Sequence, residues 1–191
     1  DQLYKTAYQE SGTAMPEYKP AHLQFRDYID ELLGSSIVSV SDTPYASLLK
    51  RLENSDWVRY GHDKYQDKAG DVCPYCGQPL DRHHFEEDLA AVFDKRYEQA
   101  IQSLNSMCEN YKAQLNTAAL TLQHNTGFTG PLSDEYQSRF DLFMEKAHRN
   151  LDAIKAKIAA PATPATIDNQ DLLDALQQVN DTVAKINAEI R

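Results

Sequence analysis

The chain has 191 residues and a formal net charge of −10, with seven glycines and eight prolines. An acidic balance of this size argues against a dedicated nucleic-acid surface, because phosphate binding relies on a basic face. Alanine, leucine, glutamine, glutamate, aspartate and lysine fill long runs of the sequence, and most of these residues favour helices. The composition therefore predicts an all-α protein that makes no direct contact with nucleic acid.

Cysteine usage and hydropathy bear on the compartment. The chain has three cysteines, and two of them, Cys73 and Cys76, form a close Cys-x-x-Cys pair. This usage argues against a disulfide framework and favours a reducing cytoplasm. No apolar run approaches the roughly 20 residues that span a bilayer, and no signal-peptide pattern opens the chain. We therefore expect a cytoplasmic protein without a membrane partner.

The N-terminal part, residues 1–72, is predicted to be an irregular helical arm. Helical spacing of apolar residues occurs over 22–33 and again over 43–66. The segment 34–42 between them is predicted to be a loop or a short extended piece. Residues 1–20 have no clear pattern, since two prolines limit any helix there.

The C-terminal part, residues 85–191, is predicted to be an arm of three helices. The first helix begins near Asp81 and ends at the glycines and proline of 124–131. Its apolar residues are separated alternately by four and three positions, which is the seam of a heptad pattern. The seam residues are Tyr97, Ile101, Leu104, Cys108, Tyr111, Leu115, Ala118 and Leu122.

Two further helices with one apolar face each complete this arm. The second is predicted to begin at an N-cap near Ser133 and to stop before the prolines of 161–166. The third begins at Asp168 or Asn169 and runs to Arg191. Helices with such long seams pack against one another, so we expect an antiparallel helical bundle or coiled coil.

The stretch DVCPYCGQPLDRHHF, residues 71–85, has the residues of a metal site. In Cys-Pro-x-Cys-Gly, proline restricts the backbone after the first ligand, and glycine can adopt the positive φ that closes the turn. Two thiolates from such a turn can fill two corners of a zinc tetrahedron. Residues 73–84 are therefore predicted to form a zinc knuckle, with Cys73 and Cys76 as ligands, at a tip of the bundle.

The other two ligands have several possible sources. His83 and His84 could complete a Cys₂His₂ site within one chain, although adjacent residues at a helix start point about 100° apart. The same two cysteines of a second copy could instead complete a Cys₄ site across a two-fold axis. The cysteine pair could also be a redox dithiol, but the βαβ context of such motifs is missing. A plain turn between helices, without metal, is the fourth possibility.

Other chemical motifs are weak or absent. The sequence has no Gly-x-x-x-x-Gly-Lys-Ser/Thr phosphate loop and no Ser-His-Asp or carboxylate pair with meaningful spacing. We therefore expect no enzymatic activity from this chain alone. Cys108 is expected to be a packing residue, His62 a surface histidine or a remote candidate ligand, and Trp57 to pack against a helix end.

The segment SLLKRLENSDWVRYGHDKYQDKAGDVCPYCGQPL, the helix start FEEDLAAVFDKRYEQAI and the later helices resemble a known insertion. It is the coiled-coil insertion of a bacterial AAA/ABC-type ATPase family that includes the RloC and PrrC anticodon nucleases and related phage-defence ATPases. The resemblance covers about residues 45–191, and Trp-Val-x-x-Gly followed by Cys-Pro-aromatic-Cys-Gly-Gln is its specific part. CPYCGQPL is also similar to the zinc hook of long SMC-like repair ATPases.

This resemblance implies that Cys73 and Cys76 are zinc-hook ligands and that the chain forms a homodimer through the hook. It also implies that the nucleotide-binding halves of a parent ATPase, together with any nuclease effector, lie outside residues 1–191. The chain starts at Asp1 without an initiator methionine, which fits a piece of a longer protein. The alternative is a monomeric zinc-binding interaction domain with an intrachain site that uses His83 and His84.

Overall fold

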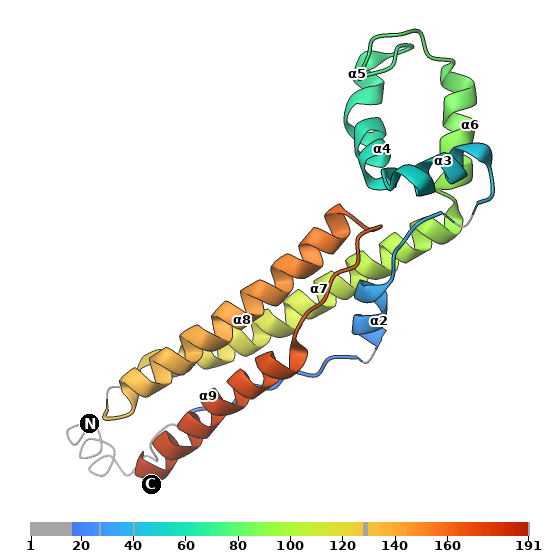
Figure 1. The fold of residues 1–191 in the computed structure, drawn as a ribbon. Coiled ribbons are helices and arrows are strands. Elements are labelled where there is room, and N and C mark those ends of the chain that lie inside the picture. Colours follow the sequence, from blue (N-terminus) through green and yellow to red (C-terminus); the bar gives the residue numbers. More distant parts are fainter. Residues whose placement is uncertain (1–16, 27, 40, 128–129, 191) are drawn as a thin grey trace. The chain divides into compact units, whose positions relative to one another are not determined.

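A computed structural model describes residues 17–26, 28–39, 41–127 and 130–190 of the chain (Figure 1). These residues form helices and connecting loops, with no β-strand among them, so the all-α prediction is confirmed over this part. None of the helices described is long and apolar enough to cross a membrane. Residues 1–16 of the predicted N-terminal arm and Arg191 of the last predicted helix lie outside the described residues.

The helices follow one another in chain order with short connections. They are α2 (Tyr28–Gly34), α3 (Pro44–Leu52), α4 (Ser55–Gly61), α5 (Asp67–Ala69), α6 (Arg82–Val92), α7 (Lys95–Gln123), α8 (Ser133–Ala159) and α9 (Asn169–Ile190). A π-helical segment, η1 (His62–Gln66), joins α4 to α5, and a 3₁₀ segment, η2 (His124–Gly127), follows α7.

The chain divides into two compact units. The first contains the described residues of 1–27, 108–153 and 167–191, and the second contains those of 28–107 and 154–166. The candidate site of residues 71–85 lies in the second unit.

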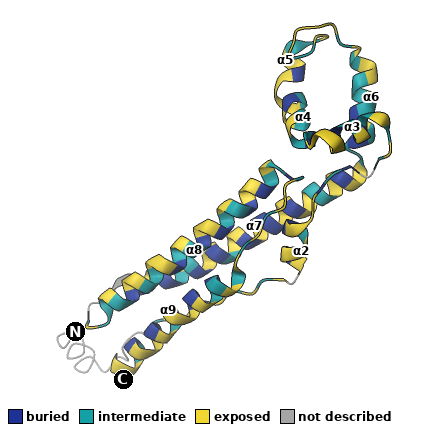
Figure 2. Cartoon of the chain, viewed as in Figure 1, coloured by how far each residue is buried: buried dark blue, intermediate teal, exposed yellow. Residues whose placement is uncertain are grey.

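In the first unit, parts of α7, α8 and α9 pack along one another. The Tyr136 hydroxyl of α8 donates to the carbonyl of Leu122 in α7 at 2.6 Å, and burial raises the pKa of Tyr136 to about 12. Arg139 of α8 donates to the carbonyl of Gln178 in α9. Buried residues follow one face of these helices (Figure 2). The predicted heptad seam is confirmed in α7, because all of its members are buried except Ile101, which is half-buried.

An extended segment, residues 17–26, lies along α7 and α9. Its backbone bonds to side chains of α9, with the Tyr18 amide donating to Asn187 and the Ala21 amide to Asn180, each at 2.9 Å. The Phe25 ring stacks on Tyr111 of α7 with ring centroids 4.5 Å apart. The predicted helix over 22–33 is therefore wrong in its first half, where the chain is extended, and helical only from Tyr28 onward.

The second unit contains the site and a small core of its own. Ala46 and Leu49 of α3 pack against Val92 of α6. Helix α3 starts where predicted, because the Thr43 hydroxyl accepts from the Ala46 amide at 3.2 Å.

The single helix predicted from Asp81 is in fact two helices. The Asp94 carboxylate accepts from the amides of Arg96 and Tyr97, each at 3.0 Å, and this cap starts α7 anew. The preceding Phe93 has φ −97° and ψ 59°, which lies outside the helical region. Its ring is instead packed against the α3–α6 core. The apolar pattern of the sequence continues across this point. The contact of Phe93 with the core and the cap at Asp94 nevertheless divide the helix in two.

Candidate metal centre

Residues 71–80 form a tight reversing turn, called here the Cys turn. The Cys73 amide donates to the carbonyl of Gln78 at 2.8 Å, and the Gly77 amide donates to the carbonyl of Cys73 at 2.9 Å. Val72 and Pro79 pair across the turn as an isolated antiparallel bridge. Gly77 has φ +70°, a conformation in which glycine carries no steric penalty. The glycine of the Cys-x-x-Cys-Gly motif thus has the role that the sequence predicts.

The turn folds backbone N–H groups toward the first cysteine. The amides of Tyr75 and Cys76 hydrogen-bond the Cys73 sulfur and lower the pKa of this thiol, and the Cys76 side chain contributes to the same shift. Cys73 is half-buried and Cys76 is exposed, and both are free of disulfides. This arrangement is consistent with the prediction from the sequence that both thiols belong to one turn.

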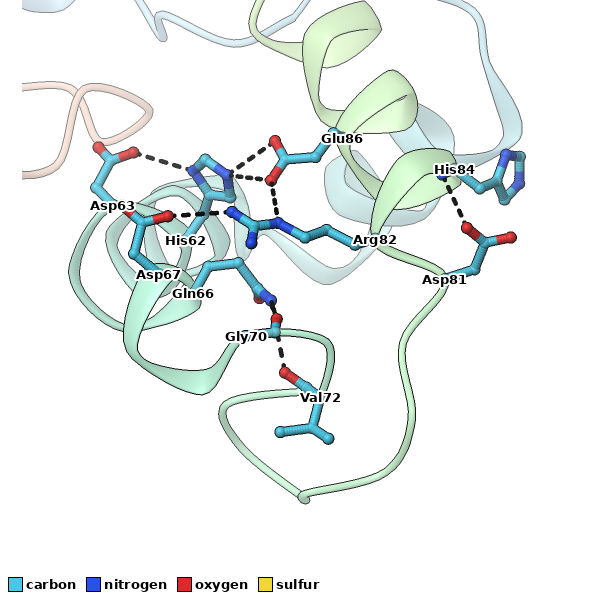
Figure 3. Close-up of polar contacts among 10 residues, drawn as sticks. All are labelled: His62, Asp63, Gln66, Asp67, Gly70, Val72, Asp81, Arg82, His84 and Glu86. Carbon is cyan, nitrogen blue, oxygen red and sulfur yellow. Dashed lines mark hydrogen bonds and ion pairs between the residues drawn. The ribbon is translucent and has the colours of Figure 1, made fainter.

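Helices on both sides hold the Cys turn. Gln66, which is buried, donates from Nε2 to the carbonyl of Gly70 at 2.9 Å, just before the turn begins. Across the turn, Arg82 of α6 donates to Asp67 of α5 at 3.1 Å (Figure 3). The turn is therefore attached at its start by an amide and across its ends by an ion pair.

A second contact between the same two sides involves His62. Its Nε2 lies 3.1 Å from Oε2 of Glu86 in α6, and its Nδ1 lies 3.2 Å from Oδ1 of Asp63 (Figure 3). Both ring nitrogens of His62 therefore have carboxylate partners, and this residue has a role in joining α6 to η1.

His83 and His84 lie on α6 and face carboxylates of the same helix. His83 Nδ1 is 3.5 Å from Glu87, and His84 Nε2 is 3.8 Å from Asp88. Their side chains are 83% and 73% exposed, and His84 points away from His62 in Figure 3. Asp81, which caps α6 by accepting from the His84 amide at 3.3 Å, fixes where this helix starts. Neither histidine is placed with the two thiols.

Two aromatic residues outside the predicted ligands complete the site. The ring of Tyr75, in the Cys turn, stacks on Trp57 of α4 with centroids 4.2 Å apart and an interplanar angle of 22°. The Tyr75 hydroxyl lies over Gly61, where an added Cβ would come within 1.5 Å of it. Trp57 and Gly61 are four residues apart and so share one helix face, which is the sequence signal that could have pointed to this contact. Trp57 therefore packs on the Cys turn, and not on a helix end.

The fit of a metal ion can be judged from the donors. Within the described part of the chain, no group of three or more His, Cys, Asp or Glu side chains is arranged to hold a metal ion. Cys73 and Cys76 supply two thiols, of which one accepts amide hydrogen bonds, and zinc favours a tetrahedron of such soft ligands. The residues thus fit half of a zinc site.

Cys108 is buried on the α7 seam, as predicted for a packing residue.

Comparison with known proteins assigns the family. No curated protein matches the chain, and no solved structure matches it. The family model described as AAA domain matches residues 2–191, which is nearly the whole chain. This agrees with the AAA-type ATPase resemblance carried by the segment around the Cys turn. The chain belongs to the AAA domain family.

Proposed function

We propose that this chain is a helical insertion of an AAA-type ATPase and that it joins two copies of the protein through one shared zinc ion. Cys73 and Cys76 of each copy would be the four ligands. Bound zinc would supply structural cross-linking and no chemistry of its own. Because thiolates must be reduced and deprotonated to bind zinc, the contact would depend on metal and on thiol redox state.

The arrangement of the Cys turn carries this proposal. Two thiols lie in one closed turn, with amides donating to Cys73 and with Cys76 exposed. The nearest histidines in sequence, His83 and His84, instead face Glu87 and Asp88 on α6. A half-site with one exposed sulfur can be completed from a second copy without rearranging α6, and a two-fold axis supplies identical ligands.

The parent protein follows from the resemblance to the RloC and PrrC type of ATPase. On that basis, the nucleotide-binding halves belong to segments outside residues 1–191, and the parent acts in the cytoplasm in phage defence or nucleic-acid metabolism. The membership of the AAA domain family supports the ATPase part of this proposal. The chain alone would not be an enzyme.

Zinc content and mass, measured on the same reduced sample, test the proposal. A shared Cys₄ site predicts about half a zinc ion per chain and a dimer, whereas an intrachain Cys₂His₂ site predicts about one zinc ion per chain and a monomer. Cys73→Ser combined with Cys76→Ser should abolish both the zinc and the dimer.

The matched control variant is His83→Ala combined with His84→Ala. These two residues are exposed and adjacent to the turn, so the variant should retain the zinc content and mass of the unmodified chain. Loss of zinc in this variant would instead support the intrachain site. An unchanged dimer in the double cysteine variant would exclude the Cys turn as the dimer contact.

A further inference from the structure

Four large aromatic side chains lie exposed around the Cys turn. They form the aromatic patch, which consists of Trp57, Tyr60, Tyr65 and Tyr75. Their exposed fractions are 54%, 54%, 43% and 48%. Exposed aromatic residues that gather in one place on a surface are typical of binding sites, since each removes much apolar area from water when covered.

The four rings form two contacting pairs. Trp57 stacks on Tyr75, and the rings of Tyr60 and Tyr65 meet edge to face with centroids 5.9 Å apart. Tyr60 raises the pKa of Tyr65 through a side-chain hydrogen bond. Tyr75 belongs to the Cys turn, and its hydroxyl lies over Gly61, which follows Tyr60 directly in α4. The patch is therefore continuous with the half-site of the two thiols.

Zinc geometry determines what a second copy would meet. Zinc–sulfur bonds are about 2.3 Å long, so the sulfurs of two copies sharing one ion lie within about 4 Å of each other. Tyr75 is located between Cys73 and Cys76 in the sequence of the turn. It must then lie at the contact between copies, and Trp57, stacked on it, is brought close to the same contact.

We propose that a second copy of this chain docks on the aromatic patch, so that patch meets patch across the two-fold axis through the metal. The inference rests on the shared zinc site proposed above. The contact is isologous, and each side supplies the same four rings. Each chain carries a net charge of −10, so two copies repel each other. The aromatic contact and the metal together offset this repulsion.

Trp57→Ala and Tyr60→Ala test the aromatic patch in the 191-residue chain with zinc and reductant present. Each should raise the dissociation constant of the dimer about tenfold or more, because buried tryptophan and tyrosine dominate such interfaces. Sedimentation velocity over a concentration series gives this constant. Tyr60→Ala leaves the Trp57–Tyr75 stack in place, so it separates loss of the contact from distortion of the Cys turn. Far-ultraviolet circular dichroism checks that each variant is folded.

The control is Tyr28→Ala, which removes an exposed tyrosine that lies outside the patch. This variant should dimerise as the unmodified chain does. Trp57 is the only tryptophan of the chain, so its emission should shift to shorter wavelength on dimerisation as the ring loses water.

Two other outcomes are distinguishable. If both patch variants dimerise with unchanged affinity and half a zinc ion per chain, the patch inference is overturned and the shared zinc site stands. If the unmodified chain is a monomer with one zinc ion per chain, the shared site and the patch contact are both overturned.

Discussion

The Lys157 ammonium donates to the carbonyl of Pro161 at 2.7 Å, inside the loop that follows α8. It also donates to the carbonyl of Thr163 at 3.0 Å and to that of Ser35 after α2. The residue is only 1% exposed, and burial lowers its pKa while Asp56 opposes this shift. One buried cation thus ties the end of α8 to the loop after α2.

Replacing Lys157 by Met should destabilise the chain by about 2 kcal/mol, because one buried and two part-buried carbonyls lose a charged donor while the apolar stem is kept. The fall in the free energy of unfolding is measured by urea titration. Lys155→Met, which changes an exposed lysine on the same helix, is the matched control, and its effect should be small because water screens the contacts of an exposed lysine. Equal stability of both variants would show that the three bonds contribute nothing.

Gly61 provides a second test, because the Tyr75 ring occupies the space where a Cβ would lie. In Gly61→Ala the ring must leave its stack on Trp57. Since Tyr75 is half exposed and can swing outward, the cost should be modest, about 1 kcal/mol. The emission of Trp57 should change in the folded variant.

The control for this change is Gly34→Ala, since nothing lies within 4 Å of a Cβ built on Gly34. It should leave the emission of Trp57 as it is. In a chain that already carries Tyr75→Ala, Gly61→Ala should no longer lower the free energy of unfolding through a clash with the Tyr75 ring. If emission is unchanged in Gly61→Ala, the stack does not exist in solution.

The long helices could be predicted from sequence because their signals are local and repeated. The α7 seam is a period of apolar residues, and the start of α9 is a cap that Asp168 makes by accepting from the Asp171 amide at 2.8 Å. Both features depend on residues within one or two turns. Neither needs information from elsewhere in the chain.

The features missed depend on contacts between distant residues. The extended segment at Tyr18 and Ala21 is held by Asn187 and Asn180, more than 150 positions away. Residues 22–26 of this segment share the helical spacing of 22–33, but contacts with side chains of α7 and α9 hold the segment in its extended path. The break between α6 and α7 likewise needs the core that accepts Phe93.

The closed turn around Cys73 and Cys76 could be predicted from the sequence, but its surroundings could not. Cys73, Cys76 and Gly77 follow from a short motif with a geometric meaning. That His83 and His84 face α6 carboxylates depends on where Asp81 caps the helix, because a shift of one residue turns side chains by about 100°. The stack of Trp57 on Tyr75 joins positions 18 residues apart through a turn whose path the sequence does not specify.

Gly77 tests the backbone of the Cys turn. With φ +70° and no atom within 4 Å of an added Cβ, Gly77→Ala introduces only backbone strain, of about 1 kcal/mol. Because the strain acts within the turn, it should weaken the proposed binding of zinc, while the melting temperature of the folded chain changes little. Gly77→Asn should behave more like the unmodified chain, since asparagine tolerates this conformation better. Competition with a chromogenic chelator measures zinc affinity, and equal affinities for alanine and glycine would contradict the expectation.

The ion pairs of Asp171 should make the stability of the first unit depend on pH. Lys146 and Arg149 of α8 both donate to its carboxylate, and the hydrogen bond from Lys146, followed by that from Arg149, lowers the pKa of Asp171 below its ordinary 3.8. A carboxyl whose pKa is lower when folded stabilises the fold above the unfolded value and loses this contribution as pH falls through the folded value. Asp171→Asn should therefore lower the melting temperature at pH 7, with the difference from the unmodified chain shrinking below about pH 3.8.

The control for this pH dependence is Asp174→Asn on the same helix, whose carboxylate accepts from the neutral amide of Gln170 at 2.7 Å. Because no cation is involved in that bond, this variant should show a much weaker change between pH 7 and pH 3. Thermal unfolding of the two variants and the unmodified chain across this range makes the comparison. If Asp171→Asn lowers the melting temperature by the same amount at both pH values, the lost contribution comes from packing and not from charge. If the loss of melting temperature disappears in acid, the ion pairs between α8 and α9 are the source of the lost stability.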